Sequence, residues 1–146
     1  MDLIQALTVY LNSNFVLYTK THSYHWMVVG PLFHELHLMF EGQYTNLWEN
    51  VDTIAEKIRQ LDGRVRITPD SQKTLSIIDP NVELMEELGY VEQLYRDHNR
   101  MIMLLGKVFD VAESVDDQAV MNYIAERIDF HKKTRWFLKA TLEQMA

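Results

Sequence analysis

Histidine and carboxylate side chains with metal-binding chemistry gather between residues 25 and 56. His37 and Glu41 are four residues apart, and so are Asp52 and Glu56, so each pair shares one face if the segment is helical. His25 precedes both pairs. Imidazole and carboxylate ligands with open positions suit Fe(II), which can be oxidised and released, better than a closed structural zinc site. All five side chains are therefore candidate iron ligands.

The two pairs cannot meet within one helix. At about 100° per residue, the four side chains fall within an arc of about 100° beside the apolar stripe. Glu41 and Asp52 are eleven residues apart, which is about 16 Å along a helix, whereas metal–ligand bonds are about 2 Å long. A second copy of this helix, packed antiparallel across a two-fold axis, would set one pair opposite the other and create two equal sites.

Composition limits the class of protein. The chain of 146 residues has no cysteine, which excludes disulfides and thiolate sites, and its six histidines and 21 acidic residues are the available ligands. The net charge of −7 argues against nucleic-acid binding over the whole surface. The sequence shows neither a secretory leader pattern nor an apolar run of about 18 residues. We therefore expect a soluble, cytoplasmic protein.

The chain is predicted to be all-α and to form one domain over residues 1–146. Only five glycines and three prolines interrupt it, which is typical of long helices with short joints. Apolar residues recur at three- and four-residue steps, and no segment has the pattern of a strand. The predicted helices span about 2–29, 32–62, 71–77, 83–113 and 117–145.

The joint between the second and third long helices differs from the others. It runs from Gly63 to Val82, holds two of the three prolines, and includes a short helix expected to be capped by Asp70. Twenty extended residues reach about 66 Å, which is more than the length of the bundle. A long middle crossover with short outer turns predicts a ferritin-like four-helix bundle with a short extra helix in that crossover.

Simpler interpretations remain for each candidate residue. Carboxylates four residues apart usually contact solvent or pair with Lys and Arg, and a lone His25 at a helix end can be a cap. His98 lies in an apolar stripe and is expected to be a hydrogen-bonded core residue. His22 and His34 each precede a proposed ligand by three residues and suggest a supporting role or an accessory metal site. Only the joint spacing of the five candidates favours the iron site.

These residues resemble the signature of the Dps miniferritins. The resemblance rests on His25-Trp26-Met27-Val28-Val29-Gly30-Pro31, Phe33, His37, Phe40-Glu41, Tyr44, Val51-Asp52 and Ile54-Ala55-Glu56. Weaker similarity, including Asp116-Asp117 and Trp136, extends along most of the chain.

The resemblance implies a homo-oligomeric hollow shell of twelve subunits with tetrahedral symmetry. Fe(II) would be oxidised at dimer-interface sites, two ions per shared site, with hydrogen peroxide as the favoured oxidant over dioxygen, and the ferric mineral would be kept inside. It assigns His25, His37 and Glu41 to one subunit and Asp52 and Glu56 to its neighbour. Glu41 stands where many members carry Asp, which leaves the bridging geometry open.

Other features of the family map less directly. Trp26 resembles the aromatic residue that absorbs stray oxidising equivalents, although simple packing is the alternative. An acidic pore for iron entry would use Asp116, Asp117 and Glu126, while Asn122 stands where an acid is expected. The DNA-binding members carry a Lys/Arg-rich tail, and none is expected here, so DNA condensation is not predicted.

Four functions are therefore compared. The first is a ferroxidase and iron-storage cage that protects against oxidative stress, and the second is a DNA-compacting cage with secondary iron chemistry. The third is a classical ferritin, whose intrachain di-iron site needs Glu-x-x-His pairs, and the sequence contains none. The fourth is an inert cage or adhesion protein that kept the fold. The five-ligand set favours the first.

Overall fold

The computed structural model describes residues 1–143, and its helices contain all the regular structure of that range. The elements in order are α1 (Leu3–Met27), α2 (Phe33–Gln60), α3 (Pro69–Leu75), α4 (Glu87–Ser114) and α5 (Gln118–Glu143). This confirms the predicted all-α class and the short extra helix between the second and third long helices. The predicted end of the last helix at Met145 lies outside the described residues.

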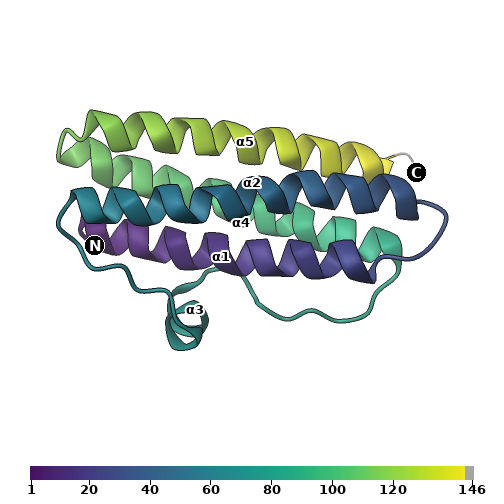
Figure 1. Ribbon diagram of the computed structural model, residues 1–146. Coiled ribbons are helices and arrows are strands. Elements are labelled where there is room, and N and C mark those ends of the chain that lie inside the picture. Colours follow the sequence, from purple (N-terminus) through teal and green to yellow (C-terminus); the bar gives the residue numbers. More distant parts are fainter. Residues whose placement is uncertain (144–146) are drawn as a thin grey trace.

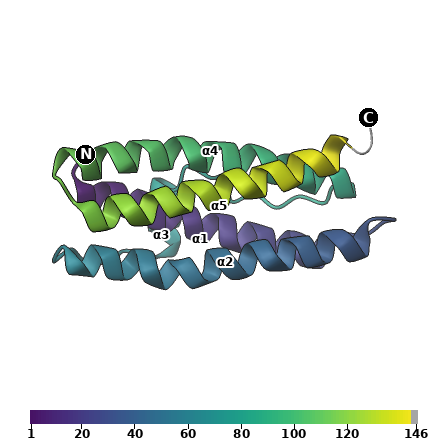
Figure 2. The same cartoon turned by 90° about the horizontal axis from the view of Figure 1, so that it is seen from above.

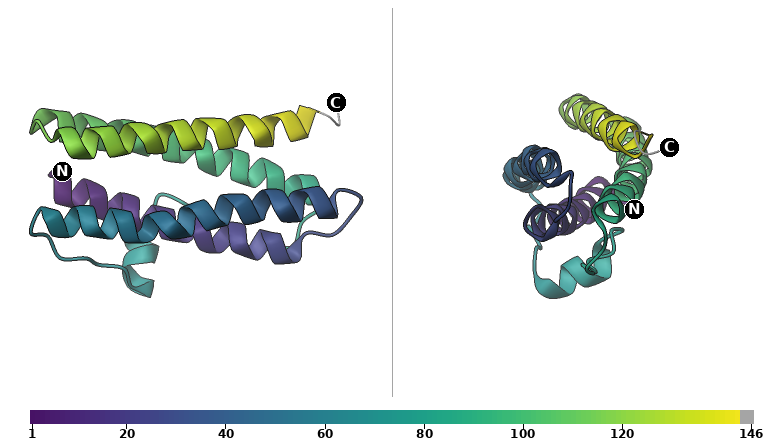
Figure 3. Two further views of the ribbon diagram at one scale, coloured as in Figure 1. Left: turned by 45° about the horizontal axis from the view of Figure 1, so that its top comes forward. Right: turned by 90° about the vertical axis from the view of Figure 1, so that its right-hand side faces the viewer.

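The four long helices form an elongated bundle made of two hairpins (Figure 1). Helices α1 and α2 pack against each other, α4 packs against α5, and α1 joins the two hairpins by packing on α4. Seen from above, α4 and α5 lie on one side and α1 and α2 on the other (Figure 2). The crossover with α3 runs along the length of the bundle beside α1 (Figures 1 and 3). This is the ferritin-like connectivity expected from the long middle joint.

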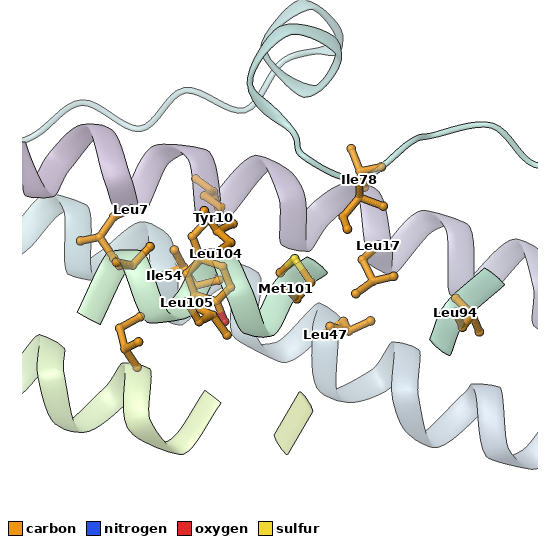
Figure 4. Packing of buried hydrophobic residues seen from close by; sticks show 14 of the residues in the cluster. Leu7, Tyr10, Leu17, Leu47, Ile54, Ile78, Leu94, Met101, Leu104 and Leu105 are labelled. Atoms are coloured by element: carbon orange, nitrogen blue, oxygen red, sulfur yellow. The ribbon is translucent and has the colours of Figure 1, made fainter. Parts of the chain in front are cut away.

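Helix α1 is the central element of the core. A capping box starts it, in which Asp2 Oδ1 accepts from Gln5 N–H and Gln5 Oε1 accepts from Asp2 N–H. Because α2, α3 and α4 all contact it, α1 buries residues around most of its circumference. Leu7, Tyr10 and Leu17, which are labelled in Figure 4, belong to one of these buried faces. Helix α2, by contrast, buries a single stripe and leaves its other face exposed.

The short helix of the crossover begins earlier than the sequence indicated. It spans Pro69–Leu75 rather than about 71–77, and its cap is Thr68 rather than Asp70. Thr68 Oγ1 accepts from Ser71 N–H at 3.0 Å, and Ser71 Oγ accepts from Thr68 N–H at 2.8 Å. Pro69 then occupies the first helical position, where its missing N–H costs nothing, and Asp70 lies in the first turn.

The third long helix begins at Glu87 rather than near residue 83. The Tyr90 hydroxyl accepts from Met85 N–H at 3.0 Å, which holds the preceding chain outside the helix. The Glu87 carboxylate accepts from Leu32 N–H at 3.0 Å, so the start of α4 docks on the α1–α2 turn. Gly30 in that turn has φ +132°, and a Cβ there would lie 2.6 Å from Glu87 Oε2, so only glycine fits this contact.

Helix α2 ends one turn after its last proposed ligand. Asp62 follows it in the left-handed conformation with φ 61°, and Gly63 N–H donates back to the Ile58 carbonyl at 3.0 Å. This closes the helix as a Schellman-type turn with Asp in the position usually taken by glycine. In the described part of the chain, no helix is both long and apolar enough to span a bilayer.

Candidate metal centre

His25 and His37 lie face to face where α1 and α2 meet at the end of the first hairpin. Their rings stack with centroids 3.7 Å apart and an interplanar angle of 17°. His25 Nδ1 lies 2.7 Å from the His37 carbonyl oxygen, and His37 Nδ1 lies 2.8 Å from the His25 carbonyl oxygen. The two residues are therefore locked together by reciprocal side-chain to backbone hydrogen bonds.

These two hydrogen bonds determine which nitrogen of each ring is available. A carbonyl oxygen can only accept, so each Nδ1 must carry the proton and donate it. In the neutral ring, Nε2 then carries the lone pair, which is the form a metal requires of imidazole. Backbone carbonyls that receive Nδ1–H are the usual partners that orient metal-binding histidines. Both rings are thus prepared to bind a metal through Nε2.

Glu41 and the second carboxylate pair lie along the exposed side of α2. Glu41 is one turn beyond His37, whereas Asp52 and Glu56 follow about 16 Å or more further along the same continuous helix. All three carboxylates are exposed, and none takes part in the ion pairs found within residues 1–143. Within that range of a single chain, no three His, Asp or Glu side chains are grouped closely enough to hold a metal ion.

An aromatic cluster lies beside the histidine pair. The His22 ring stacks between Trp26 and Tyr44, at centroid distances of 3.9 and 3.8 Å, and its Nδ1 lies 3.1 Å from the Tyr18 hydroxyl. Burial lowers the pKa of His22, and His25 lowers it further. His22 therefore supports the neighbouring rings, whereas His34 is exposed on α2. Trp26 packs on His22 but remains 66% exposed, and its role beside the site stays a prediction.

The predicted pore residues lie at the opposite end of the bundle, around the α4–α5 turn. Asp116 is exposed with φ 55°, and Asp117 Oδ1 accepts from Val120 N–H at 3.0 Å, so Asp117 caps α5. Glu126 and Asn122 are exposed on α5. A pore would need further copies of the chain, so the assignment stays a prediction.

The sequence patterns did not predict the buried ion pair between Lys20 and Asp97. The Lys20 ammonium lies 2.9 Å from Asp97 Oδ2, with both side chains almost fully buried, and also donates to the Asp79 carbonyl at 2.9 Å. A signal was present, because Lys20 is the first Lys or Arg in the chain and the next is Lys57. A lone basic residue inside an otherwise buried helix indicates an internal partner.

The expectation for His98 was only partly right. His98 is buried, but its hydrogen bond is to His131, with the two Nδ1 atoms 2.8 Å apart, and neither Nε2 has a partner within residues 1–143. Burial lowers the pKa of His98 to about 3 and holds that of His131 well below its usual value, so both rings are neutral. No sequence pattern pointed to His131, because it faces α4 only in the folded bundle.

Comparison with known proteins identifies the family of this chain. Residues 4–146 match the family model for the ferritin-like domain. DNA protection during starvation protein 2 of Bacillus anthracis is 33% identical over 88% of this chain and 88% of its own length. General stress protein 20U of Bacillus subtilis is 30% identical over 97% of each chain. The crystal structure of a Dps protein from Bacillus brevis superposes with a TM-score of 0.93, at 28% identity over 96% of this chain and 94% of that one.

A Dps protein from Vibrio cholerae, described as a member of a broad superfamily of ferritin-like diiron-carboxylate proteins, superposes with a TM-score of 0.91. It is 26% identical over 96% of this chain and 88% of its own. The fold and the family model thus define a ferritin-like protein. Within that class, the chain belongs to the Dps-type miniferritins.

Proposed function

We propose that this protein is the subunit of a homo-oligomeric cage, a dodecamer, that binds Fe(II), oxidises it and stores the ferric product, and so protects against oxidative stress. The observation that carries the proposal is the reciprocal His25–His37 lock, which leaves two Nε2 lone pairs free beside Glu41. Support comes from relatives named for Dps, general stress and the diiron-carboxylate superfamily. Iron is the substrate and cargo of this site.

The site is completed by a second copy of the chain. Asp52 and Glu56 are too far along α2 to reach the histidine pair of their own subunit, and an antiparallel copy of α2 brings them there. Trp48 supports this arrangement, since it lies within the arc of the proposed ligands and is 55% exposed. Exposed tryptophan on one face is typical of a surface that a partner covers.

The ligand set suits the oxidation of iron. Three carboxylates from two subunits balance most of the charge of two Fe(II) ions, and the additional positive charge of Fe(III) strengthens their attraction. Two Fe(II) ions give two electrons to one hydrogen peroxide, which takes up two protons and leaves as two water molecules. Glu41 carries the same charge as Asp, which many Dps miniferritins have at this position, and its side chain is longer by one methylene group.

A mixing experiment tests the shared site directly. One variant, His37→Ala, lacks a histidine ligand, and the other, Asp52→Ala with Glu56→Ala, lacks the carboxylates. Each alone should oxidise Fe(II) with peroxide at least about 100-fold more slowly than the unchanged protein, followed by ferric absorbance. When the two variants are unfolded together and reassembled at equal amounts, about one quarter of the sites should be intact, because mixed dimers contain one complete site.

Control variants distinguish the loss of the shared site from a general loss of folding or assembly. Asp110→Ala with Glu113→Ala removes two exposed carboxylates from α4 and should leave the rate unchanged. A mixture without any recovery, although native mass spectrometry shows particles that contain both variants, would mean that each site belongs to one chain. A monomeric mass in solution would contradict the proposal altogether.

DNA compaction is the second candidate, because the relative from Bacillus anthracis is named for DNA protection. The net charge of −7 opposes it, since binding to phosphates needs clustered Lys and Arg. Retardation of plasmid DNA in a gel at physiological salt would favour this function, and free migration at protein excess would reject it.

A further inference from the structure

A second polar cluster lies inside the bundle, on the opposite side of the core from the proposed iron ligands of α1 and α2. It contains five buried side chains, each with one atom that has no hydrogen-bond partner within residues 1–143. The four long helices all contribute, and the unpartnered atoms are Asn14 Oδ1, Gln43 Oε1, His98 Nε2, Arg127 Nη2 and His131 Nε2. Buried polar atoms are rarely left unpaired, so this Arg127 cluster calls for a ligand.

The members of the Arg127 cluster lie at one level of the bundle. Arg127 Nε donates to the Tyr10 hydroxyl at 3.0 Å, and Nη1 donates to Asn46 Oδ1 at 2.7 Å, so the guanidinium bridges α5, α1 and α2. Asn14 Nδ2 donates to the carbonyl of Leu47, the residue after Asn46. On α5, His131 follows Arg127 by one turn and shares its face.

The charge of the Arg127 cluster indicates the kind of ligand. Arg127 is only 5% exposed, and none of the ion pairs formed within residues 1–143 includes it. Burial raises the pKa of Tyr10, so this phenol stays protonated and supplies no negative charge. Burial keeps both imidazoles neutral. A buried guanidinium without a counter-ion is costly, and a small anion beside it would remove that cost.

A groove between α2 and α5 borders the Arg127 cluster. The groove has a volume of about 590 Å³ and is lined by Gln43, Phe130, Lys133 and Thr134, among others. Gln43 lines the groove and also belongs to the Arg127 cluster, whereas the other four members do not line it, so Gln43 separates the groove from the buried atoms. The groove carries one lysine, Lys133, and one carboxylate, Glu35, so its formal charges balance. The Arg127 cluster itself contains a guanidinium and no carboxylate, which disfavours a metal cation.

We propose that the Arg127 cluster binds a small monovalent inorganic anion of the size of chloride. Arg127 Nη2–H is the principal donor. The His98–His131 pair supplies one more donor, because a shared proton between the two Nδ1 atoms leaves one ring with Nε2–H and the other with a bare Nε2. The Gln43 amide, turned so that its NH₂ group faces the anion, is a further donor. The anion would thereby hold α5 to α1 and α2.

Anomalous diffraction tests the site in the unmodified protein. Crystals of the assembled protein soaked in sodium bromide should show an anomalous peak within hydrogen-bonding distance of Arg127 Nη2. Density for water alone at this position, while bromide is seen on the protein surface, would overturn the proposal. Since bromide is heavier than chloride but similar in size, a missing peak cannot be attributed to exclusion by volume.

A solution measurement checks the same site with a matched pair of variants. Replacing sodium gluconate by sodium chloride at equal ionic strength should raise the Tm of the unchanged protein by about 4 °C or more. Arg127→Met should remove this chloride-specific rise, whereas Arg135→Met, the same change at a half-buried position of α5, should keep it. An equal chloride effect in all three proteins would contradict the assignment, and if Arg127→Met does not fold, the bromide result decides.

Discussion

Two pairs of histidines in this molecule differ in what their Nδ1 atoms bond to, and therefore in which ring nitrogens stay free. At the α1–α2 edge, His25 and His37 each donate Nδ1–H to the other's carbonyl, so both rings have the same tautomer and both Nε2 atoms are free to bind metal. In the interior, His98 and His131 share one proton between their Nδ1 atoms, so their tautomers must differ. The His25–His37 pair can therefore offer two Nε2 lone pairs to metal ions. The His98–His131 pair can offer only one, because one of its Nε2 atoms carries a proton.

Charged groups also differ between the interior of the bundle and the α1–α2 edge. Inside the bundle, Lys20 and Asp97 are paired at 2.9 Å and almost inaccessible to water. At the edge, Glu41, Asp52 and Glu56 stay exposed, with no cation paired to them within residues 1–143. The Lys20–Asp97 pair is thus neutralised within one chain, whereas the carboxylates at the edge are left for metal and a second subunit. Stability should therefore depend on the interior, and iron chemistry on the edge.

The largest effect on this comparison should come from breaking the interior ion pair. Lys20→Met removes the buried cation from Asp97 and leaves only Gln93 and the half-exposed Arg100 as partners of its Oδ1, so it should lower the free energy of unfolding by about 3–5 kcal/mol. Guanidinium unfolding at fixed protein concentration measures it. Lys139→Met, which removes an exposed lysine 4.0 Å from Glu143, should change stability by less than about 1 kcal/mol.

The double variant Lys20→Met with Asp97→Leu measures whether the ion pair itself contributes net stability. Burial raises the pKa of Asp97 even though Lys20 opposes the shift, so desolvation outweighs the attraction within the pair. We therefore expect the double variant to recover most or all of the stability lost in the single one. A double variant as unstable as Lys20→Met would show that the pair contributes net stability.

The next largest effect is expected on metal affinity at the α1–α2 edge. His37→Leu removes one of the two prepared Nε2 ligands and the hydrogen bond to the His25 carbonyl. Affinity for Co(II), measured by titration of its visible absorption, should fall by at least about 10- to 100-fold while the assembly remains intact. His34→Leu, an exposed change one turn earlier on α2, should leave the affinity unchanged, and an equal loss in both variants would argue against His37 as a ligand.

The smallest effect, counted per pH unit and per histidine, is the pH dependence of stability that the interior histidines produce. Their pKa values are lowered in the folded protein, to about 3 for His98, so the unfolded chain binds more protons below pH 6.5. Stability should therefore fall on acidification from about pH 6.5 towards pH 3, by up to about 1.4 kcal/mol per pH unit for each histidine. Urea unfolding at pH 7 and pH 5 measures this slope.

Replacing both His98 and His131 by leucine provides the control for this pH dependence. The His98→Leu, His131→Leu double variant lacks the two titrating rings, so its stability should fall less between pH 7 and pH 5 than that of the unchanged protein. His34→Leu should keep the original slope, since His34 is exposed. Identical slopes in all three proteins would mean that the interior pair does not titrate differently in the folded and unfolded states.

Much of the architecture followed from local sequence patterns. Apolar periodicity and sparse Gly and Pro predicted long helices, and the proline-containing joint predicted the crossover with its short helix, as the structure has them. Element ends were less accurate, because the cap at Thr68 depends on a reciprocal bond with Ser71, and the start of α4 depends on a Tyr90 contact with Met85. Each of these is a choice among several polar residues that only packing resolves.

The sequence alone determined that the chain is helical and that His25, His37, Glu41, Asp52 and Glu56 are the candidate ligands, because helical spacing is a local property that residue numbers express. Tertiary structure decided what each ring and charge faces: the His25–His37 lock, the Lys20–Asp97 pair and the Arg127 cluster. These join residues on different helices, and the hydrogen-bonding partner of a ring fixes its tautomer. That partner exists only after the helices have packed.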